Sequence, residues 1–401
     1  MERIKIKREV VLKIFYYFIL IAFLFPRGYT EYNITYKRLA SYLVWISVIL
    51  IWINILISIY RKKKITINKK EIVPIVAYFL ISILITIIVR KGILTGLQQL
   101  FAYPTICAFI LFKVKGNQKI FLNCMNNIML ILLILNPIMT KEFFEIGSHL
   151  TFLGHVQLIS QLGLLATFSS ILYYILFKEK KIKTYCTIFF IGINLLTTDA
   201  TAATLTAVLL IICFIIYKIN LKNILLLDSK IYILVGIALN ILVITISILN
   251  NILNNNAISV LDFTGRSFIW IDAIEKIRNS LLFGYGIDGI KLSVFWNKWT
   301  AIDGFNYAHN QILQNMIDGG IILFICFWKM VITFCKNIKN ISNEKIRILS
   351  NSILIIFLII MIFESATLYS YLFIFLSIVY TLKYNSELNK NIKEKKLDGI
   401  N

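Results

Sequence analysis

The chain has 401 residues, of which 59% are hydrophobic and only 15% are charged, and its mean hydropathy is +0.80. Soluble globular domains carry about 25% charged residues, so this composition excludes that class. Lys and Arg total 42 against 20 Asp and Glu, a formal net charge of +22. In a soluble protein such an excess would favour nucleic-acid binding, but in a membrane protein its distribution among the loops decides its meaning.

About twelve apolar segments have the length of a bilayer-spanning helix, which needs roughly 20 residues. The first has basic residues before its apolar core, as a signal peptide does. No small-residue cleavage site follows it, so we interpret it as an uncleaved first span. The sequence therefore predicts an all-α integral membrane protein, with spans at 11–26, 39–60, 72–89, 93–112, 120–139, 152–177, 184–198, 200–217, 231–249, 310–335, 348–363 and 366–382.

The short loops between these segments alternate in charge. Basic clusters at 61–64, 178–181 and 336–347, together with the Lys-rich C-terminal segment, fall on one side of the predicted membrane. The positive-inside rule places that side, and both termini, in the cytoplasm, which makes the chain a multi-pass protein of the cytoplasmic membrane. Nucleic acid is not needed to explain the charge. We expect one polytopic membrane domain over residues 1–401.

Several kinds of site are excluded by missing motifs. The six cysteines lie in or beside apolar segments without the paired spacing of zinc ligands. The chain has no Walker or dinucleotide glycine motif, and no D-x-D pair of the kind that holds a metal in nucleotide-sugar enzymes. The sequence thus predicts no metal site, no cofactor and no nucleotide.

The longest connection, residues 250–308, lies between the ninth and tenth spans and is predicted to be extracytoplasmic. Trp270, Ile274, Ile277 and Leu281 recur in it at helical spacing, with polar residues between them. This pattern predicts an amphipathic helix that either lies in the headgroup plane or caps the membrane bundle.

Arg266 falls in the first turn of this predicted helix if Thr264 is the N-cap residue. Free backbone N–H groups and the positive end of the helix dipole favour a phosphate there, and Arg adds a bidentate fork. The alternative is a solvated arginine on an exposed loop.

His309 is predicted to lie where the chain enters the tenth span. Below it Gln311, Asn315 and Asp318 line up along one face of the predicted helix. Polar side chains inside a membrane segment are costly and usually face a cavity or a partner. The histidine is therefore a candidate general base, and the alternative is an ordinary interfacial residue.

These motifs together resemble the signature of the O-antigen ligase and polymerase superfamily, membrane enzymes of bacterial polysaccharide assembly. The family pattern reads approximately G-R-x-x-x-W, G-x-G, H-N-x-x-L-Q and E-x-G. The corresponding residues are Gly265-Arg266 with Trp270, Gly284-Tyr285-Gly286, His309-Asn310 with Leu313-Gln314, and Asp318-Gly319-Gly320.

The resemblance implies a glycosyltransferase that uses no nucleotide sugar and no metal. Its donor would be a glycan on undecaprenyl diphosphate at the outer membrane face, and its acceptor a sugar hydroxyl of another lipid-linked unit. Arg266 and His309 would be catalytic, and Asn310, Gln314 and Asp318 would bind substrate. A flippase and chain-length regulator proteins are the partners that the resemblance implies.

A second segment, residues 153–157, resembles the L-G-F-x-H-P-N segment of some capsule polymerases, with one residue missing. It makes His155 and Gln157 candidate substrate-binding residues, while a structural role for His155 remains open.

The chain departs from the family at two places. The family often has a Ser-Arg pair opening the span after a short outer turn, but residues 197–200 contain no arginine. We expect Arg90 or Lys91, at the outer end of the third span, to supply that charge. The other departure is Asp318, which keeps a carboxylate where the family usually has Glu.

The leading function is a repeat-unit polymerase for capsule, exopolysaccharide or O-antigen. A ligase that moves the finished polymer to lipid A core or another acceptor has the same motifs. From a different class, a flippase of lipid-linked sugars would also need many spans and outward basic residues, but it would not need His309 at the start of a span.

Overall fold

The computed structural model describes residues 2–30, 32–61, 69–89, 97–114, 116–143, 149–253, 266–293 and 304–384. The protein is an all-α membrane protein with one two-stranded antiparallel hairpin among the described residues. In chain order the helices are α1 (Glu2–Phe23), α2 (Ile34–Tyr60), α3 (Lys69–Val89), α4 (Leu97–Phe109), α5 (Gln118–Phe143), α6 (Leu158–Phe177), α7 (Lys181–Thr197), α8 (Thr201–Lys218), α9 (Ser229–Leu253), α10 (Arg266–Asn279), α11 (Gln311–Cys335), α12 (Glu344–Phe363) and α13 (Tyr371–Thr381).

Each predicted span coincides with a helix, but two of the helices start later than expected. The segment predicted at 152–177 begins with the hairpin of β1 (Leu150–Thr151) and β2 (Gly154–His155), and α6 starts at Leu158. Gly154 has a φ of +142°, which no helix accommodates. At 366–382 a short 3-10 turn precedes α13. Both corrections shorten a span at its predicted outer end.

Eight helices among the described residues are long and apolar enough to cross a membrane: α2, α3, α5, α6, α8, α9, α11 and α12. The shorter apolar helices are Gln99–Val114 and Tyr371–Thr381. A count of twelve spans therefore stays a prediction, because α13 alone is shorter than the roughly 20 residues that a full crossing needs.

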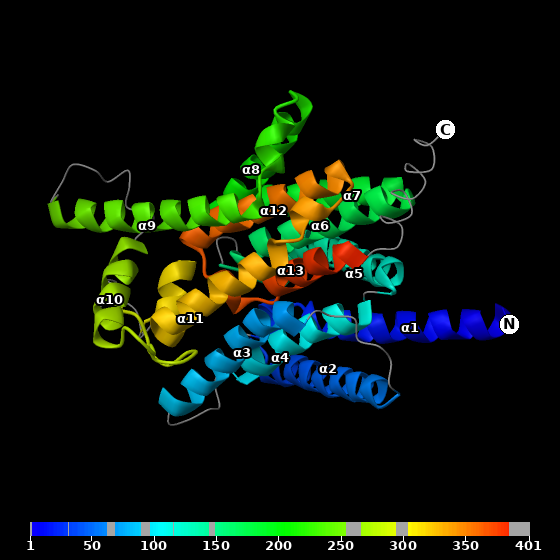
Figure 1. The fold of residues 1–401 in the computed structure, drawn as a ribbon, viewed down its shortest axis with the longest axis horizontal. Coiled ribbons are helices and arrows are strands. Elements are labelled where there is room, and N and C mark those ends of the chain that lie inside the picture. The colour runs from blue at the N-terminus through cyan, green and yellow to red at the C-terminus, as the bar shows by residue number, and fades with distance from the viewer. Residues whose placement is uncertain are drawn as a thin grey trace.

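The helix ends separate into two groups. α1 begins at the right of Figure 1, whereas α9 ends and α10 lies at the left. Ion pairs such as Lys119–Glu179 and Lys222–Glu344 join residues at or beside the ends of different helices. α1 thus begins at one end of the bundle and α10 lies at the other.

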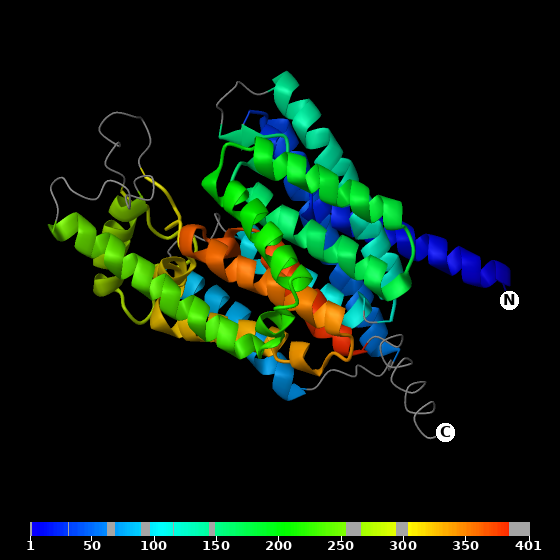
Figure 2. The same cartoon turned by 90° about the horizontal axis from the view of Figure 1, so that it is seen from above.

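α12 is the central helix of the bundle. It contacts both α9 and α6, as Figure 2 shows from above. Phe357 of α12 stacks on Phe375 of α13 at 5.3 Å, and Phe375 meets Phe168 of α6 edge-on at 4.8 Å. These rings fix the end of α12, and with it the turn at Glu364, relative to α6 and α13.

α10 packs against α9 and α11 and so caps one end of the bundle. Its buried face consists of Ile269, Trp270, Ala273 and Ile277. The predicted apolar face of this helix is correct at Trp270 and Ile277, which are buried. It is wrong at Leu281, which is 51% exposed, because the helix ends at Asn279.

The segment after α10 binds to a break in α11. Gly319 and Gly320 have non-helical backbone angles, and Gly320 has a φ of +60°. Here the Tyr285 N–H donates to the carbonyl of Ile317 at 2.7 Å, and the Gly286 N–H donates to that of Asp318 at 3.1 Å. The two glycine motifs of the family signature are therefore halves of one backbone contact.

We expect Gly284→Ala to destabilise this contact. Gly284 has a φ of +59°, and a Cβ there would lie 2.3 Å from the carbonyl oxygen of Ile317. A left-handed alanine costs about 1–2 kcal/mol before the backbone clash is added. Thermal unfolding in detergent should occur several degrees lower. Gly192→Ala in α7 is the control, because its Cβ would meet no atom within 4 Å. Equal melting temperatures for the two variants would contradict the prediction.

Candidate active site

Four segments that are far apart in sequence meet at the end of the bundle capped by α10. They are the start of α10, the turn before α11, the residue that precedes α6, and the turn after α12. Each contributes one polar side chain: Arg266, His309, Gln157 and Glu364, in that order. We call these four residues the Glu364 cluster.

Glu364 lies between a guanidinium and an imidazole. Its Oε1 accepts a hydrogen bond from Nη2 of Arg266 at 2.8 Å, and its Oε2 lies 3.5 Å from Nδ1 of His309. The side chains of Arg266, His309 and Glu364 are 11%, 8% and 5% exposed, respectively. Because little water screens them, each charge strongly affects its neighbours. The 3.5 Å contact is longer than a normal hydrogen bond and can shorten when a substrate fills the site.

Gln157 contacts the same imidazole nitrogen. Its carboxamide nitrogen is 3.3 Å from Nδ1 of His309. The tautomer with the proton on Nδ1 donates toward Glu364, and a carboxamide turned to present its oxygen would accept from that N–H. This tautomer leaves Nε2 of His309 with a lone pair, which is the arrangement of an imidazole base oriented by a carboxylate.

The backbone at His309 is held in the left-handed region, with a φ of +49°. Such angles cost about 1–3 kcal/mol for non-glycine residues and persist where the surroundings fix them. The neighbouring Ala308 is fixed on both sides: its N–H donates to Oε1 of Gln314, and its carbonyl accepts from the indole N–H of Trp270. The buried Trp270 of α10 therefore sets the position of His309.

Asn310 and Gln314, which were predicted to bind substrate, make hydrogen bonds within the protein. Asn310 is the N-cap residue of α11 and also donates to Asn240 and to the carbonyl of Ile362. Gln314 donates to Asp318 and accepts from Ala308 and Ser365. Both side chains hold the turns of the Glu364 cluster in place. Substrate contact by either residue stays an untested prediction.

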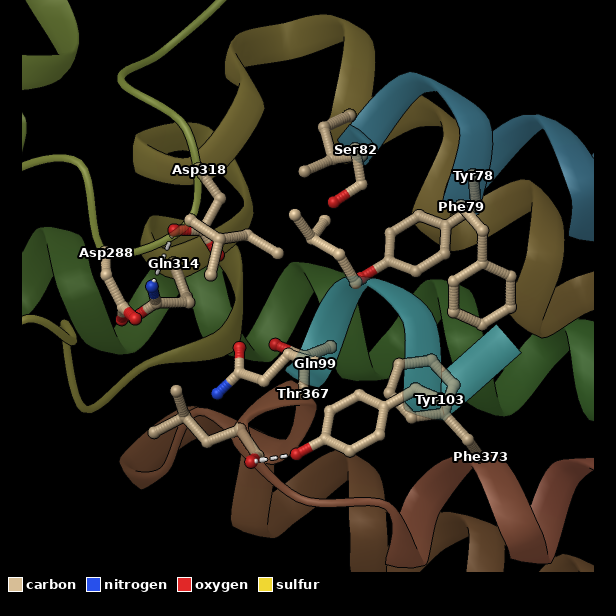
Figure 3. Close-up of a pocket in the computed structure, with 14 residues that line it drawn as sticks. Tyr78, Phe79, Ser82, Gln99, Tyr103, Asp288, Gln314, Asp318, Thr367 and Phe373 are labelled. Carbon is tan, nitrogen blue, oxygen red and sulfur yellow. Dashed lines mark hydrogen bonds between the residues drawn. The ribbon is translucent and has the colours of Figure 1, made fainter. Parts of the chain in front are cut away.

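Asp318 lines a separate small cavity. It lies roughly 12 Å along α11 from the helix start, at 1.5 Å per residue. Figure 3 shows Asp318, Gln314 and Asp288 at one end of this cavity and aromatic rings at the other. Its volume of about 20 Å³ holds one water but no sugar. In this structure Asp318 does not meet His309, and its predicted role in substrate binding remains untested.

A much larger open pocket, of about 930 Å³, adjoins the Glu364 cluster. His155, Phe305, Tyr307 and Tyr369 line it. The ring of Tyr307 lies 4.4 Å from that of His309, and the ring of Phe305 meets the imidazole edge-on at 5.6 Å. We call this volume the α1–α2 pocket, because its other wall comes from α1, α2 and the turn between them.

His155 contributes no positive charge to this pocket at neutral pH. Burial lowers the pKa of His155 below its ordinary value, although the nearby Glu364 carboxylate acts in the opposite direction. Burial also raises the pKa of Tyr307, so its hydroxyl stays protonated. Positive charge in the pocket must therefore come from Arg and Lys.

The α1–α2 pocket contains three such residues, Arg27, Lys37 and Arg38, none of which was predicted. The residues predicted to supply this charge, Arg90 and Lys91, lie outside the described part of the chain. Among the described residues, no group of three or more His, Cys, Asp or Glu side chains could hold a metal ion.

Sequence reasoning also missed Glu364. The sequence does contain a feature that marks Glu364 as a candidate: it is a single acidic residue in the short connection between the apolar segments 348–363 and 366–382. An ionisable side chain placed there is costly unless it has a partner. The sequence alone does not show that its partners are Arg266 and His309.

One comparison with known protein families matches part of the chain. Residues 186–328 match the model of a family described as O-antigen ligase. Over this segment the chain is similar to the O-antigen ligase and polymerase superfamily. No curated protein matches the chain. The matched segment contains Arg266 and His309, whereas Gln157, Glu364 and the basic residues of the α1–α2 pocket lie outside it. Members of this superfamily are glycosyltransferase-like enzymes that act on lipid-linked oligosaccharides.

We expect Glu364→Gln to destabilise the protein by about 3 kcal/mol, because it leaves the nearly buried Arg266 without its counter-ion. Adding Arg266→Gln should restore part of the loss, since the second change removes the unpaired charge. Thermal unfolding of the two single variants and the double variant measures this coupling.

Glu344→Gln is the matched control at the other end of α12. Glu344 pairs with Lys222 in an exposed ion pair, so its loss should lower the melting temperature much less than the loss of Glu364 does. Strictly additive effects of Arg266→Gln and Glu364→Gln would show that the two side chains do not interact.

Proposed function

We propose that the protein is a polysaccharide repeat-unit polymerase that takes a glycan from undecaprenyl diphosphate and joins it to a sugar hydroxyl of another lipid-linked unit. One contact carries the proposal: Gln157 lies 3.3 Å from His309. The segment 153–157, which resembles capsule polymerases, thereby meets the histidine of the superfamily signature. Two sequence resemblances that were independent of each other converge on one imidazole.

The proposed reaction uses His309 as the base. The acceptor hydroxyl gives its proton to Nε2 of His309 while its oxygen bonds to the anomeric carbon of the donor glycan. The bond between that carbon and the diphosphate oxygen breaks, and the diphosphate leaves with the electron pair. Glu364 stabilises the imidazolium that forms, and it keeps the ring oriented through Nδ1. A positioned base typically contributes 10²–10⁴-fold to the rate.

Arg266 has two tasks in this proposal. One nitrogen, Nη2, holds Oε1 of Glu364, and the other guanidinium N–H groups of Arg266 would bind an anion. Charge grows on the leaving diphosphate in the transition state, so a cation fixed beforehand lowers the barrier. Arg266 thus connects the carboxylate that orients the base with the departing phosphate.

A ligase is the second candidate, because the matched family model is described as O-antigen ligase. The same cluster would serve both reactions, and only the acceptor differs. Purified protein with a lipid-diphosphate oligosaccharide as both donor and acceptor should give a ladder of products. Transfer to lipid A core alone, with no ladder, would favour the ligase.

The prediction for His309 separates an enzyme from a transporter. His309→Ala should reduce chain extension by at least about 10²-fold while repeat units still reach the outer face, because only the proton acceptor is lost. The measurements are product ladders from purified protein and the leaflet of the lipid-linked units in cells.

His149→Ala is the control for His309→Ala, since His149 stacks on His155 but is outside the Glu364 cluster. Units stranded on the cytoplasmic leaflet in the His309→Ala strain would contradict a polymerase and support a flippase.

Membrane orientation is the remaining part of the proposal, with both termini cytoplasmic and the Glu364 cluster outside. Single cysteines replacing Asp199, between α7 and α8, or Lys181, at the start of α7, probe the two ends of one helix. Both positions are exposed. A membrane-impermeant thiol reagent should label Asp199→Cys in intact cells and Lys181→Cys only after permeabilisation. The reverse pattern would place the cluster in the cytoplasm.

A further inference from the structure

The α1–α2 pocket combines a basic wall with an apolar wall. Arg27, Lys37 and Arg38 supply the charge, and Phe25, Ile34 and Val44 are among the apolar residues. Lys37 and Arg38 stand in the first turns of α2, where positive charge is unfavourable next to the positive end of the helix dipole. An anion in the pocket would relieve that repulsion and would also interact with the dipole.

Arg27 is held in place by backbone hydrogen bonds. Its N–H donates to the carbonyl of Leu153 at 2.9 Å, and the next N–H, from Gly28, donates to that of Phe152 at 3.1 Å. A Cβ at Gly28 would lie 2.0 Å from the carbonyl oxygen of Thr151, so only glycine allows this close approach. The turn after α1 is thereby fixed to the hairpin that leads to His155 and Gln157.

None of the three basic residues has an ion pair within the described part of the chain. Glu31, which lies in the same connection, is outside the described residues. Arg27 is half-buried, whereas Lys37 and Arg38 are exposed. Three cations around one open volume, beside apolar surface, fit a ligand with several negative charges and an apolar tail.

We propose that the α1–α2 pocket binds the diphosphate and the first isoprene units of the lipid-linked donor. This inference rests on the proposed function. Two lipid diphosphates take part in that reaction, and geometry selects the donor. The donor diphosphate is bonded to the carbon that the acceptor hydroxyl attacks, so it must lie close to His309. The diphosphate of the acceptor is separated from the attacking hydroxyl by its own oligosaccharide.

The pocket meets this requirement through its shared wall, because Tyr307 lines it and lies against the ring of His309. Arg27, Lys37 and Arg38 would then neutralise the leaving diphosphate together with Arg266. In this proposal, the three residues supply the positive charge that we had expected from Arg90 or Lys91.

The test is the binding of farnesyl diphosphate to the full chain in detergent, measured by calorimetry. Arg27→Gln and Arg38→Gln should each raise the Kd about tenfold, because each removes a charge-assisted contact. Arg61→Gln, at the other end of α2, is the matched control and should leave the Kd unchanged. Equal affinity for farnesyl diphosphate in the native protein and both pocket variants would overturn the proposal.

Inorganic pyrophosphate and farnesol separate the two halves of the ligand. Farnesyl diphosphate should bind more tightly than either one. Pyrophosphate binding as tightly as farnesyl diphosphate would reduce the pocket to a phosphate site and overturn the lipid assignment. Farnesol binding as tightly would overturn the role of the basic residues.

Failure of the proposed function gives a different pattern. Farnesyl diphosphate carries no sugar, so its binding does not depend on polymerisation. If native protein makes no product ladder but the pocket variants still lose binding, the function fails and the pocket assignment stands. If native protein makes a ladder and Arg38→Gln changes neither the ladder nor the KM for the donor, the function stands and the pocket assignment fails.

Discussion

The buried charge of Glu364 is the constraint on which the functional end of the molecule depends. A carboxylate that is 5% exposed at a predicted membrane boundary is stable only beside a partner, and Arg266 is that partner. To bring them together, α10 must lie across the ends of α9 and α11, and α12 must end where α10 begins. The ion pair therefore specifies the position of α10 as well as the chemistry of the site.

The superfamily motifs divide into a reactive part and a scaffold part. Arg266 and His309 are the reactive residues in our proposal, whereas Trp270, Gly284 and Gly320 make structural contacts. Trp270 binds the carbonyl next to His309, and the glycines join the segment after α10 to the break in α11. The scaffold residues of the signature therefore fix two places: Trp270 fixes the turn at His309, and the glycines fix the break in α11.

The helices were predictable from the sequence because a bilayer imposes length and hydropathy on every span. The spacing of apolar residues also predicted the amphipathic helix at Arg266. It did not predict where this helix ends. The hairpin of residues 150–155 was not predicted, because it interrupts a run of residues that is otherwise apolar. The positions of Arg266 and His309 at helix starts were also correct, since capping and the family pattern both mark such positions.

The partners within the site were not predictable, because they depend on helix packing rather than on local pattern. Glu364 follows His309 by two spans, α11 and α12, and Arg27 lies near the other end of the chain. No periodicity relates such residues. Arg90 and Lys91 were chosen from topology alone, which places a residue at an outer helix end but does not say which helix ends are neighbours.

The matched and unmatched parts of the chain have different roles in the reaction that we propose. The matched segment, residues 186–328, contains the base and the arginine that any transfer from a lipid diphosphate would need. The residues that meet them from outside this segment come from the turn after α1, from the hairpin before α6 and from the turn after α12. In our proposal, the second set therefore positions the base and holds the donor, while the matched segment carries the transfer itself.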